Sequence, residues 1–378
     1  MTAHNRFRIA AAIGALVAPL ALVAAVSAPA DAGTKHKHDV YMYKVERNIR
    51  LVGVGSDNSA DSGSQTLSCN AGDLVLDGMW SVKHVDQYNP PAPDPDDPDD
   101  PDFPTTTTLG GQYNDERDVW VQASYPEPSD LRSWQFVLQN KAYGDAQVKL
   151  FLTCIRGYTE YTNSHHHQVK VRNLFAGAGY YADGPRNDID GHGSYKRFGT
   201  DLSLWGAPAC SSPYEYFVAP GFQFGSAGYR PIASYPRASG RSWAWEFATD
   251  GSSALPGSIR VYGRCIERRV FDGATPRHAI AMTAQPGWDF ANWYSGSVAL
   301  GNPKELQYSC GQSDHSLHAY KAMVAWFYLD SYWWDNWFLG MEPRPKTRSF
   351  YFWNHAGSPA SVRYGTLCIN SRTSNPLV

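Results

Sequence analysis

Histidines are the residues of this chain best suited to hold a metal ion. Three are consecutive, His165 to His167, and His36 and His38 form a second group near the N-terminus. Neutral imidazole is a common ligand of transition metals, but successive side chains of a strand point to opposite faces, so only His165 and His167 can share an ion without distortion. Both groups precede expected strands, where exposed polar residues are ordinary. We therefore predict no resident metal and no cofactor.

Acidic residues indicate calcium at two places, and neither pattern is complete. Asp188-Ile189-Asp190-Gly191 resembles part of a calcium loop, but Arg197 stands where that loop needs a bidentate Glu, which favours a polar turn. The stretch from Pro93 to Pro104 interleaves six Asp with Pro. Because proline favours extended backbone and like charges repel, we expect a solvated spacer loop over 90–108, with weak calcium association as the alternative.

No catalytic motif stands out in the sequence. The chain contains no Gly-x-Ser-x-Gly elbow, no His-Glu-x-x-His zinc motif and no Gly-x-x-x-x-Gly-Lys phosphate loop. Ser, His and Asp are plentiful, so a triad dispersed over the sequence stays open. We lean towards a protein that is not an enzyme.

Aromatic residues give the sharpest local signal for binding. Trp326-Phe327-Tyr328 is followed by a second run, and one β module cannot easily bury so many rings because adjacent Trp residues on a strand diverge. Exposed rings beside Asp and Asn suit a carbohydrate, a partner protein, or packing between modules, and these three uses remain open. The predicted binding residues are Tyr332, Trp333, Trp334, Asp335, Asn336 and Trp337.

The elements that must position these residues form an internal repeat. Each of three copies opens with His, any residue and an apolar strand, at His38, His167 and His278, and carries Arg-Ser-aromatic at Arg132, Arg241 and Arg348. The copies close on Cys-Ile at 154, 265 and 368. Four landmarks in the same order, including the first Cys of each copy, indicate a triplication. We place the modules at 33–160, 161–271 and 272–378.

The repeat also selects one cysteine pairing among the 15 that six cysteines allow. Copies that fold alike should each hold one internal bridge, so we predict three. The predicted disulfides are Cys69–Cys154, Cys210–Cys265 and Cys310–Cys368.

Hydrophobic periodicity within a copy is that of strands. Residues 134–138 alternate large apolar residues with others, and residues 148–152 and 259–262 lead into the second Cys. Gly, Pro, Ser and Asn separate these runs. The sequence predicts an all-β fold of three tandem antiparallel β-sandwich-like modules, each with one disulfide. The aromatic residue after Arg-Ser should face the core.

Composition and the N-terminus indicate compartment and exclude one class of partner. Arg6 and Arg8 precede an apolar stretch and Ala30-Asp31-Ala32, which is typical of a cleaved signal peptide over 1–32. The formal charge of -3 argues against nucleic-acid binding. We expect a secreted protein with no integral membrane segment once the signal is removed, the alternative being an N-terminal membrane anchor.

The first copy contains, in order, Cys69-Asn70-Ala71-Gly72, a strand ending at Gly78, Ser124-Tyr125-Pro126, Trp134 and Cys154. This order resembles a repeat of exported proteins of actinobacteria and their phages. The pattern of that repeat is Cys-Pro-Ala-Gly, a strand ending in Gly, Ser-x-Pro, a Trp strand and a closing Cys. The second copy keeps Ser-Tyr-Pro and Trp, whereas the third has Phe350 for Trp. The resemblance implies an extracellular β-rich module and no known reaction.

These patterns together predict a secreted, non-enzymatic protein of three modules that binds or coats at the cell envelope. Its partner would be an envelope glycan or an extracellular protein. Two alternatives remain: a hydrolase of extracellular polymers with a dispersed active site, and a phage-related surface structural component.

Overall fold

The structure is a computed structural model, and it describes most of the chain between residues 38 and 376. The described residues are 38–52, 61–84, 119–140, 146–161, 165–174, 178–179, 186–187, 194–198, 209–225, 229–237, 240–249, 259–270, 278–283, 294–299, 304–310, 320–330, 336–344, 346–354 and 358–376. The expected signal peptide, the Asp/Pro-rich loop 90–108 and the turn at 188–191 therefore lie outside the described residues.

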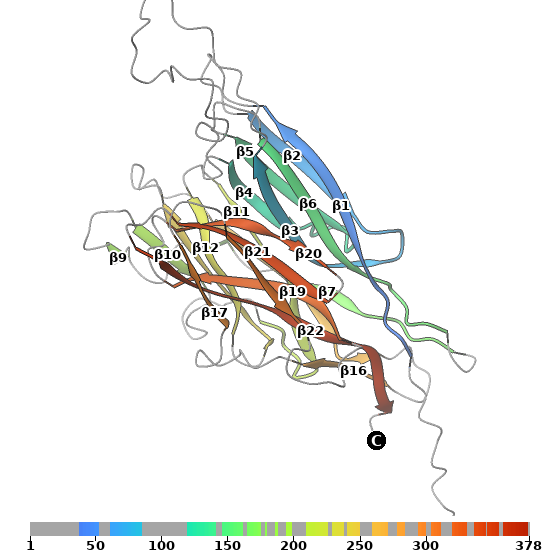
Figure 1. Ribbon diagram of the computed structural model, residues 1–378. Coiled ribbons are helices and arrows are strands. Elements are labelled where there is room, and N and C mark those ends of the chain that lie inside the picture. Colours follow the sequence, from blue (N-terminus) through green and yellow to red (C-terminus); the bar gives the residue numbers. More distant parts are fainter. Residues whose placement is uncertain are drawn as a thin grey trace, which may run out of the picture. The chain divides into compact units, whose positions relative to one another are not determined.

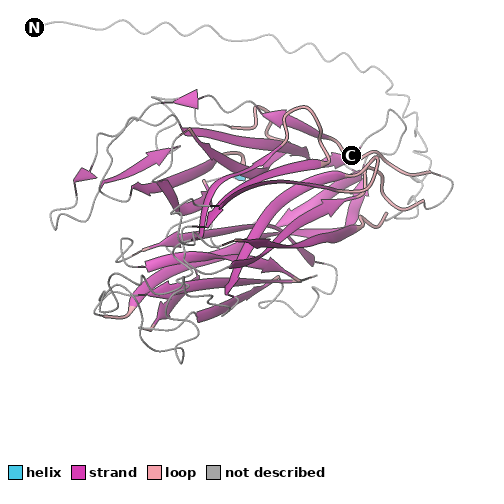
Figure 2. Ribbon diagram, turned by 90° about the horizontal axis from the view of Figure 1, so that it is seen from above, coloured by secondary structure: helices cyan, strands magenta, loops and turns pink. Residues whose placement is uncertain are grey.

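The described chain is nearly all strand (Figure 2), as the sequence predicts. We use segment one, two and three for 33–160, 161–271 and 272–378. Segment one holds β1 (Met42–Leu51), β2 (Asp61–Ser68), β3 (Leu74–His84), β4 (Val119–Pro126), β5 (Ser133–Asn140) and β6 (Ala146–Ile155). Segment two holds β7 (Val171–Leu174), β8 (Ala178–Gly179), β9 (Arg186–Asn187), β10 (Ser194–Phe198), β11 (Glu215–Phe224), β12 (Tyr229–Pro236), β13 (Trp243–Thr249), β14 (Ile259–Glu267) and β15 (Arg269–Val270). Segment three holds β16 (His278–Thr283), β17 (Tyr294–Val298), β18 (Lys304–Ser309), β19 (Tyr320–Leu329), β20 (Asn336–Pro343), β21 (Thr347–Asn354) and β22 (Ala360–Pro376). No described helix is long and apolar enough to cross a membrane.

The strands form three antiparallel sheets, and each sheet draws on two segments. The orders are β1-β6-β3-β20-β21-β18, β2-β5-β4-β11-β14-β7 with β8 beside β14, and β15-β16-β22-β19-β12-β13-β10-β9 with β17 beside β22. In every sheet the last long strand of one segment, β6, β14 or β22, lies between two other strands of that segment. The neighbouring segment adds strands on one side: β20, β21 and β18 beside β3, β4, β5 and β2 beside β11, and β12, β13 and β10 beside β19. Each segment thus contributes to two sheets and shares each of them with another segment, instead of forming a β-sandwich of its own.

Three joints, one in each sheet, link segment one to two, segment two to three and segment three back to one, so the segments form a closed ring. β4 pairs with β11, β12 pairs with β19, and β20 pairs with β3. Figure 1 shows β20, late in the chain, beside β3 from its beginning. One continuous cluster of buried residues draws on all three segments, so the core is common to them.

The joint that closes the ring depends on a glycine. Gly340 of β20 pairs with Ser81 of β3 and has a φ of 124°, which side chains other than hydrogen rarely tolerate. A Cβ at this position would lie 2.1 Å from the carbonyl oxygen of Trp80, so the two backbones could not approach as they do. The corresponding residues of the other two joints, Ala123 and Ala233, pair with β11 and β19.

All three predicted disulfides are present. Cys69 is bonded to Cys154, Cys210 to Cys265 and Cys310 to Cys368, and no cysteine is free. Every one of these residues is buried. Each bridge joins the chain just before β3, β11 or β19 to the last long strand of the same segment, and so restricts the unfolded segment.

The aromatic residue of each Arg-Ser-aromatic motif is fully buried, as predicted. Trp134 and Trp243 donate their indole N–H to the hydroxyls of Ser124 and Ser234, at 3.0 and 2.9 Å. These serines come from the Ser-Tyr-Pro at the end of the preceding strand. In segment three Arg348 pairs with Pro343, as Trp134 and Trp243 pair with Pro126 and Pro236, so the strand register gives the tryptophan position to Arg348 and not to Phe350. Met341 stands at the serine position, so the Trp–Ser hydrogen bond has no counterpart in this part of segment three.

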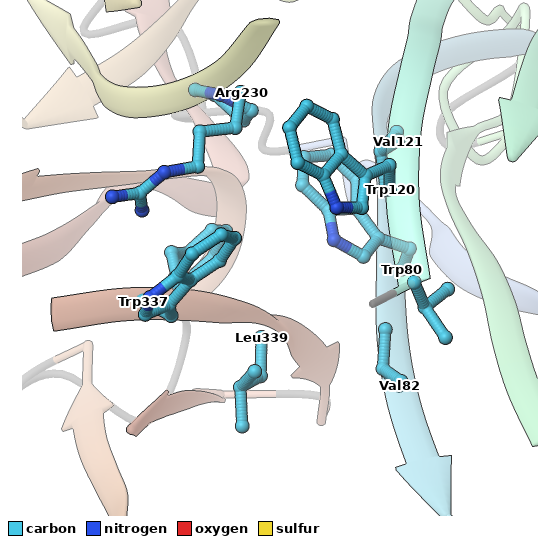
Figure 3. A pocket seen from close by; sticks show the side chains of 10 residues that line it. Trp80, Val82, Trp120, Val121, Arg230, Trp337 and Leu339 are labelled. Carbon is cyan, nitrogen blue, oxygen red and sulfur yellow. The ribbon is translucent and has the colours of Figure 1, made fainter. Parts of the chain in front are cut away.

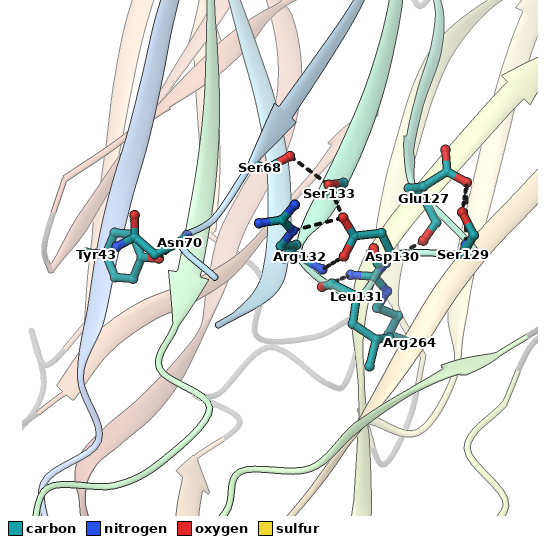
Figure 4. A network of polar contacts seen from close by, with 10 residues as sticks. All are labelled: Tyr43, Ser68, Asn70, Glu127, Ser129, Asp130, Leu131, Arg132, Ser133 and Arg264. Atoms are coloured by element: carbon teal, nitrogen blue, oxygen red, sulfur yellow. Dashed lines mark hydrogen bonds and ion pairs between the residues drawn. The ribbon is translucent and has the colours of Figure 1, made fainter. Parts of the chain in front are cut away.

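A buried arginine fastens segment two to segment one (Figure 4). Arg264 of β14 donates to the carbonyl oxygens of Glu127, Asp130 and Leu131 in the β4–β5 turn, at 2.8, 2.9 and 2.6 Å. Its Nε also donates to the side chain of Asn173 at 2.9 Å. Burial lowers the pKa of Arg264 to about 10, and the nearby acidic residues raise it. The guanidinium thus satisfies carbonyls that a turn would otherwise leave unpaired.

We expect Ser124→Ala to lower the free energy of unfolding by about 1–3 kcal/mol, because it leaves the indole N–H of Trp134 buried without an acceptor. Urea unfolding of the oxidised chain measures this loss. In the Trp134→Phe background the same serine change should cost clearly less, since no N–H remains to be satisfied. An equal cost in both backgrounds would contradict the assigned hydrogen bond.

Candidate functional site

The predicted aromatic site falls partly within the described structure. Tyr332, Trp333, Trp334 and Asp335 lie outside the described residues. Asn336 and Trp337 begin β20, where Asn336 is fully buried and Trp337 is half-buried. The structure therefore locates only the end of the predicted site.

Trp337 packs inside the molecule between the other two segments (Figure 3). The guanidinium carbon of Arg230 lies 3.7 Å from the centre of the Trp337 ring, and the ring centres of Trp120 and Trp337 are 6.4 Å apart. Arg230 also donates to the carbonyl oxygen of Asn336 at 3.2 Å. The three side chains occupy the second position of β4, β12 and β20, one from each segment. A cation over an indole face is attractive, most of all where water is excluded.

The space beside this cluster is too small for a sugar. The cavity lined by Trp80, Trp120, Arg230 and Trp337 has a volume of about 30 Å³, room for one or two waters. The indole N–H of Trp337 is buried and has no hydrogen-bond acceptor among the described groups. Carbohydrate binding, a partner protein and packing between modules are the three roles predicted for these aromatic residues. Trp337 takes the third role, packing between segments.

A larger cavity lies at the joint between segments three and one. We name it the cationic cavity, and its volume is about 280 Å³, near the lower end for small-ligand pockets. Among the described residues that line it, four are cationic and none is acidic. The lining residues are Met42, Tyr43, Lys44, Thr153, Lys321, Ala322, Pro343, Arg344 and Arg348.

Aromatic rings flank the cations of this cavity. Tyr43 of β1 is held by two hydrogen bonds, donating to the carboxylate of Asp73 at 2.7 Å and accepting from the N–H of Asn70 at 2.8 Å. Burial, and then the bond to Asp73, raises the pKa of Tyr43 to about 12, so the hydroxyl stays protonated. The ammonium of Lys321 lies 5.5 Å from the ring of Tyr41, which is 41% exposed. The cationic cavity thus has an apolar wall formed in part by tyrosine rings, with positive side chains at its edge.

The floor of the cationic cavity contains the fully buried Arg348. This arginine donates to the hydroxyl of Thr153 at 2.8 Å and to the carbonyl oxygen of Ala322 at 2.7 Å, and so ties β21 to β6 and β19. Its Nε is buried with no partner among the described groups. Burial lowers the pKa of Arg348 to about 10, and Asp77 opposes this shift.

Asp77 is the buried acid that interacts electrostatically with Arg348. It lies in β3 of segment one and accepts a hydrogen bond from the N–H of Ala325 in segment three, at 2.9 Å. Burial raises the pKa of Asp77 to about 7, although Arg348 and the hydrogen bonds from Ala325 and Gly78 lower it. The sequence offers no signal for this pair, because its two members are far apart along the chain and neither belongs to a catalytic motif.

A cavity of about 360 Å³ occupies the corresponding joint between segments one and two. Its lining contains both signs of charge, with Lys170 and Arg172 beside Glu215 and Glu267. Arg172 and Glu215 form a two-pronged ion pair with both distances at 2.6 Å, which lowers the pKa of Glu215. Charges that satisfy one another leave less attraction for a ligand than the cationic cavity offers.

The structure brings three histidines together. One ring nitrogen from each of His38, His165 and His167 lies within 4.8 Å of the others. His166 turns away and packs against Tyr158 and Tyr161, so the expected alternation of side chains in this segment is confirmed. Sequence reasoning weighed His38 and the 165–167 group separately. The signal that connects them is their shared place before the first strand of a segment.

Comparisons with known proteins assign no relatives to the chain. No family model matches it, and no curated protein is significantly similar to it. The resemblance of segment one to exported repeats therefore stays a prediction.

Asp77 should make the stability of the protein fall as the pH rises. Its pKa is raised in the folded state, so its contribution is complete below pH 4 and is lost as the pH passes through about 7. A shift from 3.8 to about 7 corresponds to at most about 4 kcal/mol. Urea unfolding between pH 4 and 8 should show this decline in the native chain.

Asp77→Asn keeps an acceptor for Ala325 and removes the titrating proton, so the decline between pH 4 and 7 should largely vanish. Asp330→Asn, which changes an exposed carboxylate, serves as the control and should keep it. Parallel stability profiles for Asp77→Asn and the native chain would show that Asp77 is not the group responsible.

Proposed function

We propose that this chain is an extracellular, non-enzymatic binding protein of the cell envelope, and that it binds an acidic glycan in the cationic cavity. The observation that carries the proposal is the lining of that cavity. It places Lys44, Lys321, Arg344 and Arg348 around one hollow, with no acidic residue among the described part of the lining.

The chemistry of the cavity suits a sugar that bears a carboxylate or a phosphate. Tyr43 and Met42 offer apolar surface to the C–H faces of a sugar ring, while the ammonium and guanidinium groups attract the anion. Lys44 and Arg344 reach Glu46 and Glu305, at 2.6 and 3.6 Å, through exposed ion pairs. Such pairs contribute little and exchange readily, so both cations can turn to a ligand.

Three disulfides support the proposed location outside the cell, because such bridges persist in oxidising compartments. The signal-like residues 1–32 point the same way. We also infer that the three segments are copies of one unit, which is supported by the common order of strands in the three sheets.

A hydrolase would need a pair of carboxyl groups facing a cleft. Asp77 has the raised pKa that such chemistry uses, but it is fully buried and is not among the residues lining the cationic cavity. The geometry therefore favours binding over hydrolysis.

Titration calorimetry with three polymers tests the proposal. Polygalacturonate carries carboxylates, poly(glycerol phosphate) carries phosphates, and dextran is neutral. We expect binding of at least one of the anionic polymers and none of dextran. Lys321→Glu should weaken that binding at least about tenfold, because it reverses a charge at the edge of the cavity.

Lys304→Glu is the matched control, since it makes the same change on β18 at a lysine that does not line the cavity. It should alter the affinity less than about twofold. Equal weakening by the two variants would mean attraction to overall charge. Absence of binding to both anionic polymers would refute the acidic-glycan ligand.

A further inference from the structure

Three short extended segments hold the histidine cluster in place. The middle one, 158–161, lies between residues 38–41 and 165–169. On one side the N–H of Glu160 donates to the carbonyl oxygen of Asp39 at 2.8 Å, and on the other the N–H of Thr159 donates to that of His167 at 2.9 Å. The N–H of His167 donates in turn to the hydroxyl of Thr159 at 3.0 Å. The backbone therefore fixes where the three imidazoles meet.

The imidazole of His38 is oriented as metal-binding histidines are. Its Nδ1 lies 3.1 Å from the carbonyl oxygen of Glu160, which can only accept, so Nδ1 carries the proton and Nε2 has a free electron pair. That Nε2 faces the Nε2 of His165 at 3.0 Å, and His165 therefore donates the proton between them. A backbone carbonyl bound to the far nitrogen is the usual support of a ligating histidine.

The rings are already close to the spacing that a metal ion requires. Tetrahedral zinc with Zn–N bonds of about 2.0–2.1 Å places its ligand nitrogens roughly 3.4 Å apart. The ring centres of His38 are 4.6 Å from His165 and 4.7 Å from His167, and those of His165 and His167 are 5.0 Å apart. With the nitrogens within 4.8 Å of one another, side-chain movements of about 1 Å complete the site.

We propose that His38, His165 and His167 bind one transition-metal ion, with Zn²⁺ the best fit. On binding, the ion takes the place of the proton between the two Nε2 atoms, and that proton moves to Nδ1 of His165, so that both imidazoles stay neutral. Three neutral imidazoles without a carboxylate suit Zn²⁺, Cu²⁺ and Ni²⁺ and disfavour Ca²⁺ and Mg²⁺. Since the described residues supply only these three ligands, the fourth position is open to a further ligand such as water, which can approach on the side of the half-buried His165.

The proposed ion joins parts of the chain that belong to different segments. His38 precedes β1 and His165 and His167 precede β7, so a bound metal ties the entry of segment one to that of segment two. Because the unfolded chain does not hold these nitrogens together, zinc should raise the temperature of unfolding.

The test uses the purified, untagged and oxidised chain after treatment with a chelator. Titration calorimetry should give one Zn²⁺ per chain, and Mg²⁺ at the same concentration should give no heat of binding. Co²⁺ should produce the strong visible absorption of a tetrahedral site. His165→Ala, at the least buried of the three positions, should weaken zinc at least about tenfold and abolish both the Co²⁺ spectrum and the rise in unfolding temperature.

His166→Ala is the matched control, because its ring packs against Tyr158 and Tyr161 and not against the cluster. Its zinc affinity should stay within about twofold of the native value. His38→Gln, checked for native disulfides and circular dichroism, should lose zinc as His165→Ala does. Absence of stoichiometric zinc, unchanged zinc binding by folded His165→Ala, or equal loss in His166→Ala would each overturn the proposal.

Discussion

The joints between strands of different segments are the constraint on which the structure depends. In each sheet one strand of a segment pairs with one strand of another segment: β4 with β11, β12 with β19 and β20 with β3. Without the other segment, each of these strands would be unpaired on that side. The common core packs against all three joints. Polar anchors then fix the joints individually. Arg264 reaches from segment two into the turn of segment one, whereas at the corresponding joint Thr153 receives Arg348 from segment three. In both joints an arginine connects the last long strand of one segment to the turn region of the other. Arg264 lies on the long strand, whereas Arg348 lies beside the turn.

Equivalent positions of the three segments have acquired different chemistry on one backbone. The Trp–Ser pair of segments one and two is replaced in segment three by Arg348 and Met341, and the arginine donates to Thr153 and Ala322 instead of to a serine. The second residues of β4, β12 and β20 are Trp120, Arg230 and Trp337, so an arginine lies where the other two segments supply rings. Two joints enclose cavities of similar size, yet the lining of one is cationic and that of the other carries charges of both signs.

Much of the fold could be predicted because it is local to each segment. Alternation along 134–138 and the recurrence of cysteines define the strands and disulfides without knowledge of any neighbour. The sharing of sheets could not be predicted, since it depends on pairings such as Gly340 with Ser81, for which the repeat has no landmark. The candidate site was harder for the same reason. Lys44 and Lys321 are ordinary surface residues in sequence, and only the closed joint brings them to one cavity. Trp337 was recognised as notable, but its burial beside Arg230 depends on a strand from another segment.

A closed succession of segments also fixes how many there can be. In an open array of repeats the outermost units need special polar ends, and units can be added or removed at little cost. Here β20 of segment three already occupies the edge of β3 of segment one. A fourth unit would have to displace that pairing, and a chain with two would leave a pair of edges exposed to association with other molecules. The protein can therefore vary its surface one segment at a time, but not its number of segments.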